Sequence, residues 1–589
     1  MTISRESRHV RADPDQVRDA LGLVRRSGVP DLLRNWRNDD RRRAGQVSRG
    51  GMPSWLSDEQ VLTVLHLVTS SGHPQTVDSM ASLILRGLDS ESLTLLGLDT
   101  AGATFNEIRA RVSRSLHRTL DVIDPHPGPK KLKQTFAELR RYELSLPDGL
   151  VEERKRRLLE LTNALLAETY RAVPEQYRQR WQGNCCVDAT FVQAFCGKGT
   201  PWASAIGDDD LVASEPFAGY YIRRKDHGVS GEDLRTMSRA ERTKLGKISW
   251  GWETTLVVMA ANFPDEVATF PLLVVGMNFH PPGISPGRHA IDALRRMHAA
   301  GMPASYLAGD RAYGPKPVTE DYAGPARELG YKLLWDLTEK ETARTRRIQG
   351  ALLLEGNLYC PAMAASEKLI TATQDLRYGD AVNGRRITQA EYDQRVAQRG
   401  RYLLKPHGGI QPNGTGRFMC PAAGPAPTVT CPLRPREDPK TVGLWPIRTR
   451  ELPDEHDRSA LCTSISGVVT FKATSRFPRL IQDKQYGTPE WLAWYTTLRQ
   501  SIESFNSYLK LGTATAMHIA DRRRVRGFAA ANLFVAMDVV AINLRKTERW
   551  LQDPVPVDAK GRGPTKAQKE RRREKLGYGP RLPRDRGTR

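Results

Sequence analysis

The first third of the chain carries apolar residues at helical spacing. From about Trp55 to Arg180, apolar positions recur every three or four residues between short polar breaks. One such run is predicted to begin at Ser57, because a serine followed by acidic residues is typical of a helix N-terminus. The apolar positions of that run are Val61, Leu62, Val64, Leu65 and Leu67. The pattern predicts an all-helical N-terminal region over residues 1–180.

After Trp181 the apolar residues gather in short runs bounded by Gly, Pro and charge, which is typical of strands. These runs are Cys185–Phe195, Ala218–Ile222, Trp252–Ala260, Phe270–Met277, Tyr306–Ala308 and Tyr331–Leu337. Helical stretches over Arg288–Ala300 and Val318–Leu329 separate the later runs, and such alternation builds parallel strands. A mixed α/β sheet is therefore predicted over residues 181–337, completed by helices over residues 487–550.

Two further segments differ from this α/β unit. Between residues 338 and 486 the helical spacing weakens, and Pro and Gly are frequent from Pro406 to Pro439, which predicts an insertion of β-structure and loop. The last segment, residues 551–589, is basic: from Ala559 to Arg589 twelve Lys and Arg stand against three acidic residues. Scattered Gly and Pro with charge of one sign predict a disordered tail.

The overall charge favours a nucleic-acid partner. The 589 residues include 89 Lys and Arg and 67 Asp and Glu, a formal net charge of +22 that attracts polyanions. An anionic membrane is the competing partner, but the N-terminal residues have neither a myristoylation nor a signal-peptide pattern. The longest apolar run, Phe528–Leu544, is interrupted by Asn532, Asp538 and Asn543. We expect a buried core helix there, and no membrane partner.

The cysteines suggest a compartment and a possible metal site. Seven in this length is a sparse, odd number, which favours a reducing cytoplasm over a secreted disulfide scaffold. Cys185, Cys186 and Cys196 are expected in the core near the first strand. The insertion holds Cys360, Cys420, Cys431 and Cys462, and four thiolates can close a tetrahedral zinc site. Because no two have the close spacing of ordinary zinc knuckles, structural Zn²⁺ and unligated buried thiols both stay open.

Two aspartates lie where an α/β sheet could use them. Asp188 lies within an apolar strand, where a carboxylate needs a cation, hydrogen-bond donors or a metal; its alternative role is to cap a turn at a strand end. Asp310 follows the short strand that ends in Gly309, and α/β sheets place their sites at such carboxyl ends. Gly-Asp is also ordinary turn chemistry.

The stretch Trp491–Lys510 predicts a helix with two stripes. At about 100° per residue, one stripe is apolar and consists of Trp494, Leu498, Ile502, Phe505 and Leu509. The neighbouring stripe is polar and consists of Tyr495, Arg499, Glu503, Asn506 and Lys510. The apolar stripe can pack against the sheet while the polar stripe faces a site. An ordinary i, i+4 surface pair of Arg499 and Glu503 is the alternative.

Together these segments resemble a known family. Val187-Asp-Ala-Thr, Leu307-Ala-Gly-Asp-Arg-Ala-Tyr and Arg499-x3-Glu503-x6-Lys510 are similar to the three catalytic segments of DDE transposases from bacterial insertion sequences. The closest resemblance is to the subgroup with a Tyr-Arg-Glu-Lys signature, although Tyr495 lies four positions before Arg499 where the family has three. The resemblance covers about Asn184 to Leu544, without the insertion.

The resemblance implies a ribonuclease-H-like catalytic domain that cleaves DNA and transfers its ends. In that family three acids bind Mg²⁺ or Mn²⁺, which implies a two-ion site held by Asp188, Asp310 and Glu503. The expected partner is double-stranded DNA, both terminal inverted repeats and target, bound by a homodimer because two ends are joined. The alternatives are a catalytically inactive, domesticated DNA-binding relative and a ribonuclease-H-like nuclease without strand transfer. A cytoplasmic, nucleoid-associated location is expected.

Several basic residues are candidates for contacts with DNA phosphates. Arg499 can grip a phosphate as a bidentate fork and Lys510 as a point charge. Further candidates precede the apolar run at Phe528; they are Arg522, Arg523, Arg524 and Arg526. For these, and for Arg41-Arg42-Arg43 in the N-terminal region, a DNA-facing cluster and a solvated surface both stay open.

Overall fold

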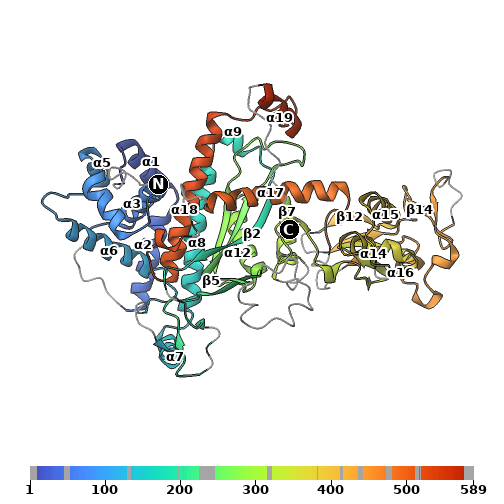
Figure 1. Cartoon of the computed structure of the whole chain (residues 1–589), viewed down its shortest axis with the longest axis horizontal. Coiled ribbons are helices and arrows are strands. Elements are labelled where there is room, and N and C mark those ends of the chain that lie inside the picture. Colours follow the sequence, from blue (N-terminus) through green and yellow to red (C-terminus); the bar gives the residue numbers. More distant parts are fainter. Residues whose placement is uncertain are drawn as a thin grey trace.

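The computed structural model describes residues 10–45, 54–128, 134–196, 198–202, 205, 207–224, 246–314, 321–380, 383–411, 415–435, 442–471, 481–510, 517 and 519–575. N-terminal helices lie at one end, a mixed sheet lies in the middle, and the insertion lies at the other end (Figure 1). Helix α17 (Pro489–Lys510) runs from the insertion across the sheet. Helix α18 (Phe528–Gln552) lies between the sheet and the N-terminal helices.

The predicted mixed sheet is confirmed. Its strands follow the order β4 (Gly219–Arg224), β5 (Gly246–Met259), β2 (Cys185–Gln193), β7 (Tyr306–Gly309) and β8 (Lys332–Trp335), and β6 (Val274–His280) also pairs with β5. Strand β5 is antiparallel to β2, β4 and β6, whereas β2, β7 and β8 are parallel to one another. The sheet thus has an antiparallel half and a parallel half, and β2 joins them.

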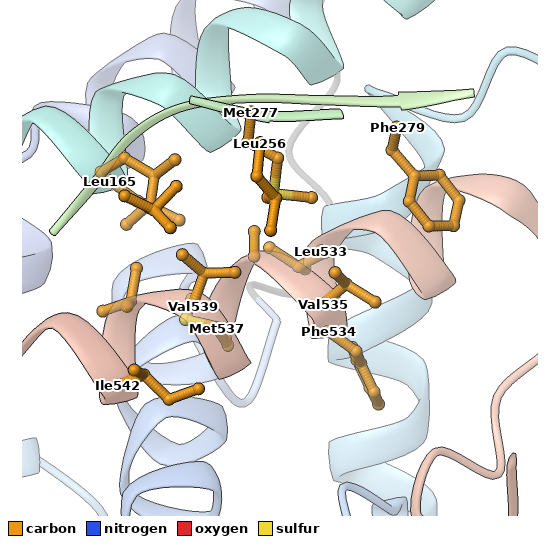
Figure 2. Packing of buried hydrophobic residues seen from close by; sticks show 14 of the residues in the cluster. Leu165, Leu256, Met277, Phe279, Leu533, Phe534, Val535, Met537, Val539 and Ile542 are labelled. Carbon is orange, nitrogen blue, oxygen red and sulfur yellow. The ribbon is translucent and has the colours of Figure 1, made fainter. Parts of the chain in front are cut away.

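Helices cover both faces of this sheet. Leu256 of β5 and Met277 of β6 are register partners, and both point toward α18 beside Leu533 (Figure 2). The other face packs on α12 (Pro286–Ala299), which agrees with the predicted helix Arg288–Ala300. A Cβ added to Gly276 would lie 2.9 Å from the sulfur of Met297 in α12, so the helix approaches this strand closely and a larger residue would displace that side chain. The later helix, α13, is shorter than predicted in the described residues and spans Ala323–Glu328.

The N-terminal region is helical, as predicted, except for the two-residue strand β1 (Gln134–Thr135), which pairs with β3 (Leu211–Val212). Ser57 caps α3, because its side chain accepts a hydrogen bond from the main-chain N–H of Gln60. The apolar core is continuous from these helices to the sheet through α18. The helices are α1 (Pro14–Arg26), α2 (Val29–Arg43), α3 (Asp58–Ser70), α4 (Val77–Ser82), α5 (Ser90–Leu96), α6 (Phe105–Asp121), α7 (Phe136–Ser145), α8 (Leu150–Arg171) and α9 (Glu175–Arg178).

The insertion has its own apolar core, but the prediction of only strands and loops is wrong. Its described residues include the α-helices α14 (Glu367–Arg377), α15 (Gln389–Tyr402) and α16 (Ala460–Thr463). Thr388 and Glu391 form a capping box at the start of α15, a helix signal that the sequence contains. The strands are β9 (Arg346–Ile348), β10 (Ala351–Leu354), β11 (Asn357–Tyr359), β12 (Lys405–Ile410), β13 (Gly416–Met419), β14 (Val429–Thr430), β15 (Trp445–Pro446) and β16 (Val468–Phe471).

The prediction of a disordered tail is also wrong for the residues that the structure describes. Helix α18 reaches Gln552, and α19 (Lys566–Lys575) follows. Arg562 forms an ion pair with Glu266, and Thr565 pairs with the same residue through the main chain. Contacts with the folded core therefore order a segment whose composition alone predicts disorder. Residues 576–589 lie outside the described part.

Helix α18 is the only described helix long and apolar enough to cross a membrane, and most of it is buried inside the fold. The predicted core helix is thus confirmed. One of its polar interruptions has a structural role: Asn543 accepts from the N–H of Val274 at 3.0 Å and donates to the carbonyl of the same residue at 2.7 Å. Asn163 of α8 does the same for Met277, at 3.0 and 2.8 Å. The two amides satisfy main-chain groups of β6 that no neighbouring strand reaches.

Replacing Asn543 with Leu is expected to lower the free energy of unfolding by about 2 to 4 kcal/mol, because two buried main-chain groups lose their partners. Urea unfolding followed by circular dichroism measures the change. Asn383→Leu is the control, since the same substitution at an exposed position should change stability by less than about 0.5 kcal/mol. Equal stability of the two variants would contradict this role for Asn543.

Candidate active site

The parallel pairing of β2 with β7 brings Asp188 beside Asp310. Val187 is the register partner of Gly309, so the residues that follow each of them lie opposite one another. Neighbouring strands are about 4.8 Å apart, and opposite residues point to the same face. Burial raises the pKa of Asp188, and the neighbouring carboxyl group of Asp310 adds to this rise. The sheet therefore joins the two predicted aspartates in one site.

The side chain of Asp188 is mostly buried, with 19% of it exposed. One carboxylate oxygen accepts from the N–H of Ala189 at 2.9 Å, and the other lies 3.3 Å from Nη1 of Arg499. Burial raises the pKa of Asp188 to about 6; Arg499 lowers it and Asp310 raises it. Asp188 thus has one guanidinium partner and a second carboxyl group beside it, an arrangement that a further cation would stabilise.

Asp310 is held by the turn after β7. Its side chain accepts from the N–H of Ala312 at 2.7 Å, and its carbonyl accepts from the N–H of Tyr313 at 3.1 Å. A Cβ added to Gly309 would lie only 2.7 Å from the Cβ of Tyr313, so the glycine lets that tyrosine fold back over the strand end. The turn at Gly309 and Asp310 therefore holds the carboxylate of Asp310 in place, so the two interpretations of Gly-Asp, a turn and a site, are compatible.

Helix α17 brings Arg499 and Glu503 to the same face. The predicted apolar stripe is confirmed for the four members that are fully buried, Leu498, Ile502, Phe505 and Leu509. Arg499 is 18% exposed and lies between Asp188, at 3.3 Å, and Glu503, at 3.8 Å. Glu503 is 61% exposed on the outer side of this cluster. Because Arg499 also binds a buried strand residue, the pair is more than an ordinary surface pair on a helix.

Three further side chains line the site. Cys186 lies two residues before Asp188 on the same face of β2, and burial raises its pKa to about 12. The hydroxyl of Tyr495 lies 3.4 Å from the carbonyl of Gly309, so this tyrosine reaches the site despite its unusual spacing from Arg499. Tyr313 is buried next to both aspartates; burial and then these carboxylates raise its pKa. The two-residue period of a strand could have placed Cys186 on the same face as Asp188, whereas the position of Tyr313 beside both aspartates depends on the tertiary fold.

A third aspartate, Asp336, lies beside these two and was not predicted from the sequence. Gly309 pairs with Trp335, so Asp336, which follows β8, lies opposite Asp310. It is paired with Arg311 at 2.8 Å and Arg377 at 3.0 Å, and it accepts from the Tyr486 hydroxyl at 2.6 Å. Although burial opposes ionisation, these partners lower the pKa of Asp336. Asp336 therefore fastens the insertion to the sheet, whereas Asp188 and Asp310 retain excess negative charge.

The candidate phosphate contacts fall into different environments. For Arg523 the prediction is wrong: it is buried, 4% exposed, and its guanidinium lies 3.5 Å from the carboxylate of Asp538 within α18. A buried aspartate needs a cation, and Arg523 supplies it. Arg522 donates to the carbonyl of Gly72. Arg524 and Arg526 are exposed, as is Lys510 at the end of α17, so these three can still meet DNA.

The donor set fits a hard divalent cation. Carboxylate oxygens are the ligands that Mg²⁺ and Mn²⁺ prefer, and Asp188 and Asp310 offer them side by side, with Glu503 nearby through Arg499. In the part of the chain that the structure describes, no three His, Cys, Asp or Glu side chains are grouped so as to hold a metal ion as they stand. No family model, curated protein or solved structure matches the chain. A function for this chain is therefore argued from the geometry of its site and the chemistry of its residues.

Asp188→Asn is expected to change stability in a pH-dependent way. Folding raises the pKa of Asp188 from 3.8 to about 6, so the wild-type protein loses stability as the pH rises through this range. The substitution removes that loss. The free energy of unfolding of the variant, relative to wild type, should increase by about 2 to 3 kcal/mol between pH 4 and pH 7. Urea unfolding in EDTA measures this difference.

Asp336→Asn is the matched control, because the two aspartate side chains are 18% and 19% exposed. Folding lowers the pKa of Asp336 below 3.8, so the stability that its carboxylate supplies is almost fully present at pH 4 and is lost only as the pH falls further. This variant should therefore be less stable than wild type by a nearly constant amount between pH 4 and pH 7. A rise of its relative stability over this range, like the rise expected for Asp188→Asn, would contradict the environments assigned to the two residues.

Proposed function

We propose that this chain is a metal-dependent DNA transposase that cleaves the ends of an insertion sequence and transfers them to target DNA. The observation that carries this proposal is the meeting of Asp188, Asp310, Arg499 and Glu503 on one face of the sheet. Asp188 and Arg499 are 311 positions apart in the chain, so their contact is a property of the tertiary fold. These are the residues on which the resemblance to DDE transposases depends.

The sheet supports the finer assignment of a ribonuclease-H-like catalytic domain. Its central strand, β2, carries the first acid and separates an antiparallel half from a parallel half. The second acid follows the neighbouring parallel strand, and the third lies on a helix that covers the same face. The insertion enters between the second acid and the third, and leaves this arrangement intact.

The chemistry follows from the donors. Asp188, Asp310 and Glu503 would hold two Mg²⁺ or Mn²⁺ ions, which when bound activate a water or 3′-hydroxyl and stabilise the leaving oxygen of a phosphodiester. Asp188 is ionised at neutral pH, because its pKa is about 6. Arg499 positions that carboxylate and has a planar fork suited to phosphate oxygens. Lys510, exposed three turns further along α17, adds a positive charge for the DNA backbone.

The charge of the chain supports DNA as the substrate. The net charge of +22 favours binding to the phosphate backbone, and such binding positions the duplex without reading its sequence. Exposed basic residues that can contribute include Arg524 and Arg526, near Phe195 and Cys196 after the end of β2, and Arg41 and Arg42 at the end of α2. A homodimer on paired DNA ends is part of the proposal, because strand transfer joins two ends.

The test uses labelled duplexes that contain the genomic DNA on either side of the coding sequence, incubated with the protein, Mg²⁺ and a target plasmid. The proposal predicts Mg²⁺-dependent cuts at the element ends and a joined product. Cleavage without a joined product would instead indicate a nuclease. Binding without cleavage would indicate a DNA-binding relative, and either outcome would overturn the proposal.

Glu503→Gln is expected to lower the cleavage rate by roughly 1000-fold or more, because the neutral amide is a poor metal ligand. DNA affinity in EDTA, measured by fluorescence anisotropy, should change by less than about threefold, since phosphate contacts come mostly from Lys and Arg. Glu490→Gln is the matched control on the same helix: the two side chains are 63% and 61% exposed. Equal cleavage by both variants would exclude Glu503 from the site.

A further inference from the structure

The insertion contains a second constellation, separate from the carboxylates. Its four cysteines are free thiols and come from four different segments. Cys360 follows β11, Cys420 follows β13, Cys431 follows β14, and Cys462 lies in α16. Cys360 and Cys420 belong to the apolar core of the insertion, and Cys431 packs against it.

Hydrogen bonds join the segments that carry the first three cysteines. The N–H of Cys360 donates to the carbonyl of Tyr402 at 2.7 Å. Thr428, three residues before Cys431, donates through its hydroxyl to the carbonyl of Arg401 at 3.0 Å. The N–H of Thr428 donates to the carbonyl of Pro421, the residue after Cys420, at 2.9 Å. Residues 401 and 402 therefore connect the chain at Cys360 with the chain before Cys431, and Thr428 connects the latter with the chain after Cys420.

Arg434 brings in the fourth segment. Its guanidinium donates to the carbonyls of Leu461 at 3.1 Å and Ser464 at 2.6 Å, on either side of Cys462. The N–H of Cys420 donates to the carbonyl of Gly467 at 2.8 Å, just before β16. A Cβ on Gly467, which has a φ of +59°, would lie 2.9 Å from this guanidinium, so the chain packs closely there.

Three of the cysteines begin the same kind of turn. Each is followed by Pro, and its carbonyl accepts from the N–H three residues later: Met363 for Cys360 at 3.0 Å, Ala423 for Cys420 at 2.9 Å and Arg434 for Cys431 at 2.9 Å. Burial raises the pKa values of Cys360 and Cys431, and main-chain N–H groups oppose this rise, that of Ala362 at Cys360 and those of Leu433 and Arg434 at Cys431. Such donors favour the thiolate, which is the form that binds metals.

The sulfurs interact with one another and with basic groups. Burial raises the pKa of Cys360 well above its usual value, and Cys420, Cys462 and Cys431 add to this effect. Burial raises the pKa of Cys462 to about 11; Cys420 and Cys431 raise it, and Arg434 and Arg458 lower it. Two buried and two half-buried thiols, with guanidinium groups nearby, thus lie in segments of the insertion that pack together.

We propose that Cys360, Cys420, Cys431 and Cys462 bind one Zn²⁺ ion as a closed structural site that fastens the insertion. Four thiolates complete the tetrahedral coordination that structural zinc prefers, and each thiol releases its proton to solvent. The described side chains do not hold an ion as they stand, so the sulfurs draw together when zinc binds. The site is independent of DNA cleavage, because none of its ligands belongs to the carboxylate cluster.

The test begins with the full-length wild-type protein, purified without chelators and analysed by plasma mass spectrometry. One zinc per chain is expected, and cobalt exchanged into the protein should show thiolate charge-transfer and tetrahedral absorption bands. Protein that contains no zinc and shows no such bands with added cobalt would overturn the proposal. Iron with inorganic sulfide in place of zinc would overturn it too. Because these measurements use the wild-type chain, they do not depend on whether a variant folds.

Matched cysteine variants then assign the ligands. Cys431→Ser should lose most of the zinc, whereas Cys196→Ser, also a half-buried cysteine but outside the insertion, should keep it. Glu503→Gln should keep the full amount, which separates this site from the proposed catalytic one. Full zinc in Cys431→Ser, or its loss from Cys196→Ser, would exclude the proposed ligand set.

Discussion

The parallel register between β2 and β7 is the constraint on which the site depends. Opposite residues on neighbouring strands share a face, so a slip of one residue would turn Asp310 away from Asp188. Buried apolar side chains on both strands, including Val187 and Leu307, oppose such a slip. Helix α17 then completes the cluster through Arg499, since its apolar stripe fixes which side chains face the sheet. Packing therefore sets the position of each charged group.

The row of aspartates shows how similar residues acquire different properties. Asp336 has two arginines and a tyrosine, so it is a satisfied structural anion that connects the insertion to the sheet. Asp188 is paired with Arg499 and lies beside Asp310, and burial keeps the pKa of Asp188 high. In the insertion the cysteines offer soft ligands to a different class of metal. The chain thus separates its proposed hard-metal and soft-metal sites by some distance in the fold (Figure 1).

Periodicity alone predicted the sheet, the core helix α18 and the stripes of α17, because these patterns reflect burial. The resemblance selected Asp188 and Asp310, which the structure brings together. Residues whose role depends on tertiary contacts could not be predicted. The place of Asp336 beside Asp310 follows from the β7–β8 register, and the burial of Arg523 follows from its ion pair with Asp538. The helices of the insertion and α19 were not predicted because Pro, Gly or charge of one sign is frequent in these segments, although a capping box at Thr388 marks the start of α15.

Iron-directed cleavage of the protein measures the proposed metal site most directly. Fe²⁺ bound in place of Mg²⁺, with ascorbate and peroxide, generates hydroxyl radicals that cut the chain close to the ion. Mass spectrometry should find cuts near residues 188, 310 and 503 that excess Mg²⁺ suppresses, and Asp310→Asn should abolish all three. Cuts confined to other parts of the chain, or cuts that survive in Asp310→Asn, would contradict a shared metal site at these acids.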